Sequence, residues 1–336
     1  MPGFTHQYVE RASGRVLDER LYSDRLINLI YNSARERMPS VFRLLTSAMW
    51  TRVLGYLNYD MAMGAKLTGN RKFIRKLGVD LNECVLPVEQ LDTARKVFER
   101  QIRYWDCRPM PADSAAIVSP ADSRILVGSF AETSSLLIKE KFFSFAELLG
   151  DRHQWREAFA GGDFAVFRLT PDKYHYNHTP VAGVVRDIYE IDGTFHSCNP
   201  GAVVTLVTPY SKNKRVVTVI DTDVEGGTRV GLVAMIEIVA MMIGRIEQCY
   251  SEAQYAQPTN VAPGQFLRKG QPKSLYHPGS STDVLVFQPG RVRFADDIVD
   301  NLRAGAQSRF TRGFGQPLVE TDVAVRSWIG TRRSEE

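Results

Sequence analysis

The strongest constraint on the fold is a change of character along the chain near residue 107. From Leu17 to about Trp105, apolar residues recur at intervals of three and four among long-chain residues, with few prolines, as in amphipathic helices. Beyond Cys107, prolines punctuate the chain, and short runs rich in β-branched residues follow between Gly, Pro, Asn and Asp turns. We therefore predict an α+β chain, in which a helical region over residues 1–105 precedes a mostly antiparallel β domain over residues 106–336.

Two groups of segments carry this prediction. In the helical region, Val41 to Leu67 is dense in Leu, Met, Trp and Tyr, so it is either a helix docked on the protein core or one that contacts a membrane. Both interpretations remain open. The runs expected as strands are Ala116–Val118, Arg124–Val127, Phe164–Leu169, Ala202–Val207, Val216–Ile220 and Val230–Ile243.

Charge and composition exclude several classes of protein. The 336 residues carry 42 basic and 38 acidic side chains, and a net charge of +4 is too small to indicate nucleic-acid binding. The four cysteines show no CxxC spacing, so neither a disulfide framework nor a structural zinc site is expected. The longest apolar run, Val230 to Gly244, contains Glu237 and is too short to span a bilayer, which leaves peripheral membrane contact open.

One segment, Pro171 to Pro180, contains two of the six histidines, His175 and His178. The flanking prolines argue against a helix, and in an extended segment this spacing puts the two rings on opposite sides. A shared metal ion is therefore disfavoured, and no metal site is predicted. Acid–base chemistry is the better functional interpretation, because imidazole titrates near neutral pH. The other histidines, His6, His153 and His196 among them, are expected at the surface or in turns.

Two further segments supply the other groups needed to activate a hydroxyl. Asp122 lies in a turn that enters a strand, and Ser280 and Ser281 follow Gly279. A base that takes the hydroxyl proton and a carboxylate that orients the base would complete the set. The GxSxG, Walker and dinucleotide-binding motifs are absent. The residues alone therefore indicate only Asp/His/Ser chemistry on a β-rich domain.

At these same residues the chain resembles the phosphatidylserine decarboxylase family, in order from about Ser119 to the C-terminus. The most specific match is Leu169 to Gly183, similar to L-x-P-x-D-Y-H-R-F-H-x-P-V-D-G. Ser119–Ile125 is similar to S-P-x-D-G-x-I, with Ser123 in place of glycine. Ile138 to Gly150 resembles I-K-G-x-x-Y-S…L-L-G. Lys269 to Ser280 aligns with K-G-x-x-x-G-x-F-x-x-G-S, with Tyr276 for Phe and Ser274 for Gly.

The resemblance implies an enzyme that makes its own pyruvoyl cofactor. Ser280 Oγ would attack the Gly279 carbonyl, with His178 accepting the proton and Asp122 orienting that ring. Elimination from the resulting ester would then split the chain between residues 279 and 280 and leave a dehydroalanine, which hydrolyses to ammonia and a pyruvoyl group derived from Ser280. If Phe287 anchors the alignment instead, Ser281 takes the place of the nucleophile.

The resemblance also implies a substrate and a location. The pyruvoyl ketone would form a Schiff base with phosphatidylserine, which loses CO2 and becomes phosphatidylethanolamine, and His175 is the candidate for protonating the carbanion. The expected partners are phosphatidylserine, the cytoplasmic face of a membrane bound peripherally, and the two cleavage chains of the protein itself. A homodimer is compatible with this, and nucleic acid is not expected. The alternatives are a pyruvoyl-dependent decarboxylase of a soluble amino acid and a non-catalytic lipid-binding paralogue.

Overall fold

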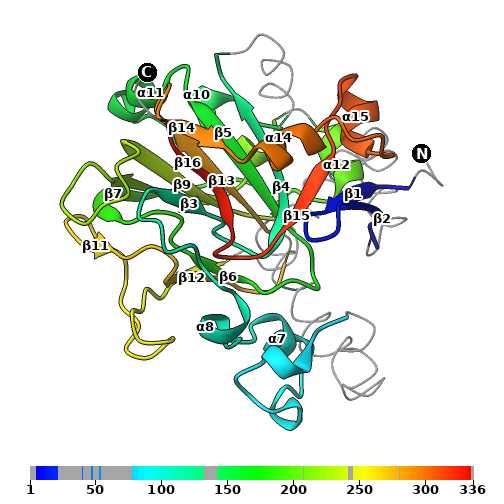
Figure 1. Cartoon of the computed structure of the whole chain (residues 1–336). Helices are drawn as coiled ribbons and strands as arrows, with labels where there is room; N and C mark the ends of the chain where they lie inside the picture. Colours follow the sequence, from blue (N-terminus) through cyan, green and yellow to red (C-terminus); the bar gives the residue numbers. More distant parts are fainter. Residues whose placement is uncertain are drawn as a thin grey trace.

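The structure is a computed structural model of the whole chain (Figure 1). It describes residues 5–21, 78–131, 142–206, 208–240, 245–279 and 281–333, together with positions 40, 47 and 53. Most of the expected helical region, including nearly all of Val41 to Leu67, lies outside the described residues.

A large sheet of ten described strands forms the centre of the molecule, in the order β11-β7-β8-β9-β13-β5-β4-β15-β1-β2. All neighbouring pairs are antiparallel except β1 and β15, which run parallel. The strands are β1 (Gln7–Glu10), β2 (Arg15–Asp18), β4 (Ser123–Ser129), β5 (Asp163–Leu169), β7 (Gly183–Ile191), β8 (Arg215–Asp221), β9 (Leu232–Val239), β11 (Phe266–Leu267), β13 (Ser281–Phe287) and β15 (Glu320–Val323).

The sheet is buried on both faces, and β13 at its centre shows how. Side chains alternate between the two faces of a strand. Val284 and Val286 pack into one apolar cluster, whereas Leu285 and Phe287 pack into a second cluster on the opposite face. Because both faces are covered, a one-residue slip of β13 would exchange the two sets and bury its polar first residues against the wrong partners.

Two smaller three-stranded sheets accompany the large one. The first has the order β10-β12-β6 and carries the histidine segment. The second has the order β14-β16-β3. Their strands are β10 (Ile246–Gln248), β12 (Pro272–Tyr276), β6 (Tyr176–His178), β14 (Val292–Phe294), β16 (Trp328–Arg332) and β3 (Ala116–Val118).

The described helices are short. Four lie between residues 81 and 107, and α7 and α8 project at the end of the molecule next to β6 and β12 (Figure 1). These four are the 3₁₀ turns η3 (Leu81–Glu83) and η4 (Val88–Gln90) and the helices α7 (Ala94–Phe98) and α8 (Tyr104–Cys107). The others are α10 (Phe145–Leu149), α11 (His153–Phe159), α12 (Pro200–Thr205), α13 (Pro209–Lys212), α14 (Asp296–Asn301) and α15 (Arg309–Phe314). No helix among the residues described has the length and apolar character needed to cross a bilayer.

The predicted α+β class with mostly antiparallel strands is confirmed, with two local differences. The run Ala202–Val207 was expected as a strand, but its described part belongs to helix α12. The side chain of Asn199 caps that helix, and Pro200 occupies its first turn, where a missing N–H costs nothing. Residues 7–18 belong to the expected helical region, but they form the hairpin β1–β2 at the edge of the large sheet.

A buried ion cluster fastens this hairpin to the sheet. Arg168 on β5 donates to Glu320 on β15 at 2.9 Å and to Glu19, just after β2, at 2.8 Å. His6, just before β1, lies 2.8 Å from the same Glu320. All these side chains are almost fully buried, so each charge depends on the others for compensation.

We expect Arg168→Ala to destabilise the fold by about 3–5 kcal/mol, because it leaves two buried carboxylates without their cation. The matched control is Arg186→Ala, since the Arg186 side chain is 52% exposed and pairs with Asp221 at the surface. That change should cost no more than about 1 kcal/mol. Denaturant unfolding of both variants measures the difference, and equal losses would contradict the importance of the buried cluster.

Candidate active site

Asp122 lies in the turn that leads into β4 and is held by an arginine rather than by a histidine. Arg108 donates to its two carboxylate oxygens at 3.0 and 2.8 Å, and the Val325 N–H donates to Oδ1 at 2.7 Å. Burial works to raise the pKa of Asp122, but the hydrogen bonds and charge of Arg108 outweigh it and lower that pKa. Asp122 is therefore a fixed anion.

His178 is fully buried on β6, and its hydrogen bonds define its tautomer. Nδ1 lies 2.9 Å from the Gly270 carbonyl, which can only accept, so Nδ1 carries the proton. Nε2 then has a free lone pair and accepts from the Tyr174 hydroxyl at 3.0 Å. Burial lowers the pKa of His178 to about 3, so the ring is neutral near pH 7.

The predicted partnership of Asp122 with His178 is not what the structure shows. In the described part of the chain no hydrogen bond joins the two side chains, and the Gly270 carbonyl holds the tautomer that Asp122 was expected to hold. The two residues are still neighbours, because the His178 N–H donates to the Pro120 carbonyl at 2.7 Å. Asp122 can therefore act on the ring only through its field or through movement.

His175 is also fully buried, and its ring stacks on Phe98 of α7 with centroids 3.5 Å apart. Neither ring nitrogen has a hydrogen-bond partner among the described residues, although the carbonyls of Thr170 and Pro171 are nearby. Burial, aided by the charge of Arg100, lowers the pKa of His175 well below its usual value. A buried polar ring without partners is costly, which suggests a functional reason for its position.

The predicted cleavage segment leads from β12 into β13. Gly279 is buried, Ser280 lies outside the described residues, and Ser281 is the first residue of β13. Ser281 is 1% exposed, and its Oγ has no hydrogen-bond partner within the described residues. Ser281 pairs with Leu169 on one side and Val239 on the other, so the strand fixes its place in the sheet.

Strand pairing determines which of the two histidines lies nearer to the cleavage segment. His178 lies opposite Pro272 in the β6–β12 pair, whereas the His175 carbonyl accepts from the Tyr276 N–H at 3.1 Å. Since a strand rises about 3.3 Å per residue, the two histidines are roughly 10 Å apart along it. His175 is thus the histidine at the end of β12 that enters the cleavage segment.

A buried charge network, which sequence reasoning missed, lies beside these strands. Lys273 and Glu237 are both fully buried and pair at 2.7 Å. Gln248 bonds to both, Asn177 donates to Glu237 at 3.3 Å, and Ser274 also donates to Glu237. Two charged residues stand out in the sequence, Glu237 within an apolar run and Lys273 within the Lys269–Ser280 segment. Only the fold shows that their side chains pair.

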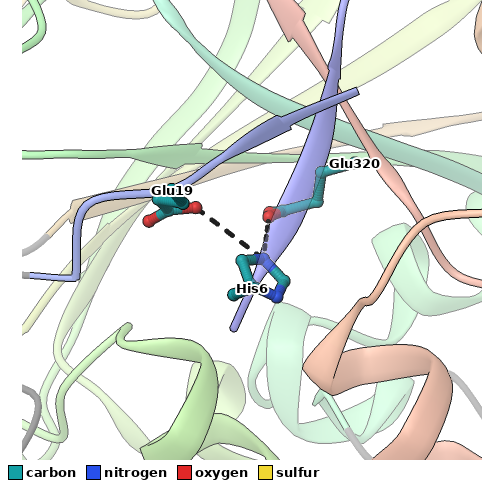
Figure 2. Close-up of side chains that lie close together, drawn as sticks. All are labelled: His6, Glu19 and Glu320. Carbon is teal, nitrogen blue, oxygen red and sulfur yellow. Dashed lines mark hydrogen bonds and ion pairs between the residues drawn. The ribbon is translucent and has the colours of Figure 1, made fainter. Parts of the chain in front are cut away.

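The hairpin cluster offers three groups at metal-ligand spacing, since atoms of His6, Glu19 and Glu320 lie within 4.8 Å of one another (Figure 2). Its hydrogen bonds argue against a metal. His6 Nδ1 accepts from the Arg309 N–H at 3.1 Å, so Nε2 must carry the proton that it donates to Glu320. Arg168 already pairs with both carboxylates. His6 and His196, both expected at the surface or in turns, are buried.

A small cavity of about 50 Å³ lies close to the start of β13. Residues 19–21, 168–171 and 197–200 line it, and Leu169 among them is the strand partner of Ser281. Cys198, also in the lining, accepts from Thr282 Oγ1 at 3.0 Å. The cavity therefore lies between the segment after β2, the beginning of the histidine segment and the segment that leads into α12.

Comparison with known proteins specifies the class of protein to which this chain belongs. Residues 94–314 match the family model described as phosphatidylserine decarboxylase. The phosphatidylserine decarboxylase proenzyme of Chlamydia pneumoniae is 29% identical over 308 residues, 91% of this chain and 95% of the relative. The proenzyme of Chlamydia trachomatis serovar L2 is 30% identical over 312 residues, 91% of this chain and 95% of that one.

A third relative, from Ruminiclostridium cellulolyticum, carries the same name and is 28% identical over 296 residues, 88% of this chain and 91% of its own length. The chain is thus a decarboxylase. It belongs to the phosphatidylserine decarboxylase family, as the resemblance of its motifs predicts.

Proposed function

We propose that this chain decarboxylates phosphatidylserine to phosphatidylethanolamine, using a pyruvoyl group made from one of its own serines. Membership of the family supports the reaction. The observation that carries the cofactor proposal is the buried hydroxyl of Ser281 at the start of β13, which has no hydrogen-bond partner in the part of the chain that the structure describes. A hydroxyl that is buried without a partner loses its hydrogen bonds to water and gains nothing in return, unless the position serves chemistry.

This observation bears on which serine reacts. The Gly279–Ser280 pair is the better match to the motif, because glycine leaves the attacked carbonyl unobstructed. The Oγ of Ser281, which has no partner among the residues described, favours the other register, in which the Ser280–Ser281 bond breaks. We propose Ser281 as the nucleophile and keep Ser280 as the alternative that the variants below decide.

The proposed formation of this group assigns a role to residues of this chain. The serine Oγ attacks the carbonyl carbon before it, its proton passes to a base, and the amide nitrogen takes a proton as the ester forms. His178 is the candidate base, since its neutral ring carries a lone pair on Nε2 and the Gly270 carbonyl fixes its tautomer. Tyr174 occupies that lone pair in the structure and would have to release it.

When formed, the pyruvoyl group supplies an electrophilic ketone that takes the substrate amine and accepts electrons as CO2 leaves. His175 is the residue of this chain proposed to move protons at the substrate. Its ring is neutral and stacks on Phe98, and neither ring nitrogen has a hydrogen-bond partner in the described part of the chain. It can accept a proton from the substrate ammonium and return a proton to the α-carbon.

A lipid substrate also requires contact with a membrane. We propose that the chain binds the cytoplasmic face of a membrane peripherally and that its two cleavage chains stay associated. The continuous β9–β13–β5 pairing supports the second part, since the strand that follows the cleavage site is paired along both edges over all seven residues.

The test of the proposed function is turnover of the purified protein on vesicles that contain phosphatidylserine, with free serine as the soluble comparison. We expect release of CO2 and accumulation of phosphatidylethanolamine from vesicles, and little CO2 from serine. Turnover of serine at the same rate would replace the lipid by a soluble amino acid. If the folded protein releases no CO2 from either substrate, the interpretation as a non-catalytic lipid-binding paralogue is the one that stands.

A further inference from the structure

Three partners meet the phenol oxygen of Tyr276, the last residue of β12. The Ile238 N–H donates to it at 3.0 Å. The Thr282 carbonyl lies 3.0 Å away, and Asp283 Oδ1 lies 2.8 Å away. Tyr276 and Asp283 are both buried, with exposed fractions of 2% and 0%. Neither residue has a part in the processing chemistry set out above.

Counting protons identifies the state of Asp283. A phenol has one proton to donate and lone pairs with which to accept. Ile238 donates to one lone pair, and the Thr282 carbonyl and Asp283 Oδ1 both lie within reach of the single phenol proton. If the Thr282 carbonyl takes that proton, Asp283 completes the group by donating to the phenol, which requires a protonated carboxyl group. An ionised Asp283 would set two acceptors against the single phenol proton.

The surroundings of Asp283 agree with this count. Asp283 lies directly opposite Glu237 in the β13–β9 pair, and Lys273 on β12 already pairs with Glu237. Its own Oδ2 has no partner within the described residues. Burial, followed by the negative charge of Glu237, raises the pKa of Asp283 well above its usual value. One buried carboxylate is thus compensated, and its neighbour stays neutral.

The position of these contacts gives them a role. Tyr276 precedes the cleavage site in either register, whereas Thr282 and Asp283 follow it. We propose that Tyr276 and neutral Asp283 form a clamp across the bond that is cut, which positions it for self-cleavage and afterwards joins the two chains beside the new terminus. Both are positioning residues. This inference rests on the proposed self-processing and deepens it.

The chain offers a sharp set of variants. Tyr276→Phe removes the shared oxygen, and Asp283→Ala removes the acid; we expect each to slow chain splitting at least about tenfold, through the loss of buried hydrogen bonds. Asp283→Asn keeps a neutral group that can donate to the phenol, so its rate should stay within about threefold of wild type. Tyr250→Phe is the matched control, because Tyr250 is a buried phenol with its own partners, Glu252 and the Arg268 N–H.

Intact mass against time measures splitting, and the infrared spectrum of wild type minus Asp283→Asn reports the acid directly. We expect the carbonyl stretch of a protonated carboxyl group in wild type and not in the variant. Asp283→Asn as slow as Asp283→Ala, Tyr276→Phe as fast as wild type, or absence of that band would each overturn the clamp. If the Asp283→Ala variant does not fold, the splitting rate of Asp283→Asn and the carbonyl band of the protonated acid still test the clamp. If the wild-type chain never splits, the proposed self-processing is itself refuted. That result differs from each of the outcomes that refute only the clamp.

Discussion

Ser281→Ala will leave the chain in one piece, whereas Ser280→Ala will still split. The first change removes a buried hydroxyl that has no hydrogen-bond partner within the described ranges, and without a nucleophile no ester can form. The second change puts a small side chain just before the proposed nucleophile and leaves the hydroxyl of Ser281 in place. Electrophoresis and intact mass distinguish one chain from two, and the effect should be all or none.

Each serine variant is the control for the other, because the two variants make the same change, the loss of one hydroxyl, at adjacent positions. The opposite pattern, with Ser280→Ala intact and Ser281→Ala split, would assign cleavage to Gly279–Ser280 and keep the pyruvoyl proposal. If both single variants split, neither hydroxyl alone is required, and the proposed origin of the cofactor is wrong.

His175→Ala will split normally but will decarboxylate phosphatidylserine roughly 10²- to 10⁴-fold more slowly, the usual contribution of a positioned acid–base group. The reason is structural: neither ring nitrogen of the buried His175 has a hydrogen-bond partner among the described residues, so the main contact that the fold loses is the stacking of the ring on Phe98. Splitting by intact mass and CO2 release from vesicles are measured on the same preparation.

His153→Ala is the control for this prediction, since His153 is exposed on α11. It should change neither splitting nor turnover. A His175→Ala protein that fails to split would move His175 from turnover to self-processing. Full turnover by the variant would remove His175 from the chemistry altogether.

Much of the β fold follows from local sequence, as two segments illustrate. Phe164–Leu169 and Val216–Ile220 are β-branched or aromatic runs bounded by turn residues, and both lie within strands of the large sheet. Ala202–Val207 has similar composition, yet its described part is helical, because the Asn199 cap and Pro200 start a helix whose apolar side packs on the core. Composition alone cannot weigh a cap against β propensity.

The candidate site was predictable in its residue types but not in its partnerships. The motif identified His175, His178, Asp122 and the serines as the candidate residues. It could not show that a backbone carbonyl, that of Gly270, orients His178, because every residue has one and only the fold selects it. The same holds for the ion pair of Arg108 with Asp122, which joins positions on separate elements.

The central claim is that a serine of this chain becomes the cofactor, and the intact mass of the downstream cleavage product of the wild-type protein tests it most directly. We predict a product that begins at residue 281, lighter by one ammonia than a chain with a serine N-terminus, because a ketone has replaced the amino group. A downstream chain that keeps its terminal amine, or folded protein that yields no second chain, would contradict the account.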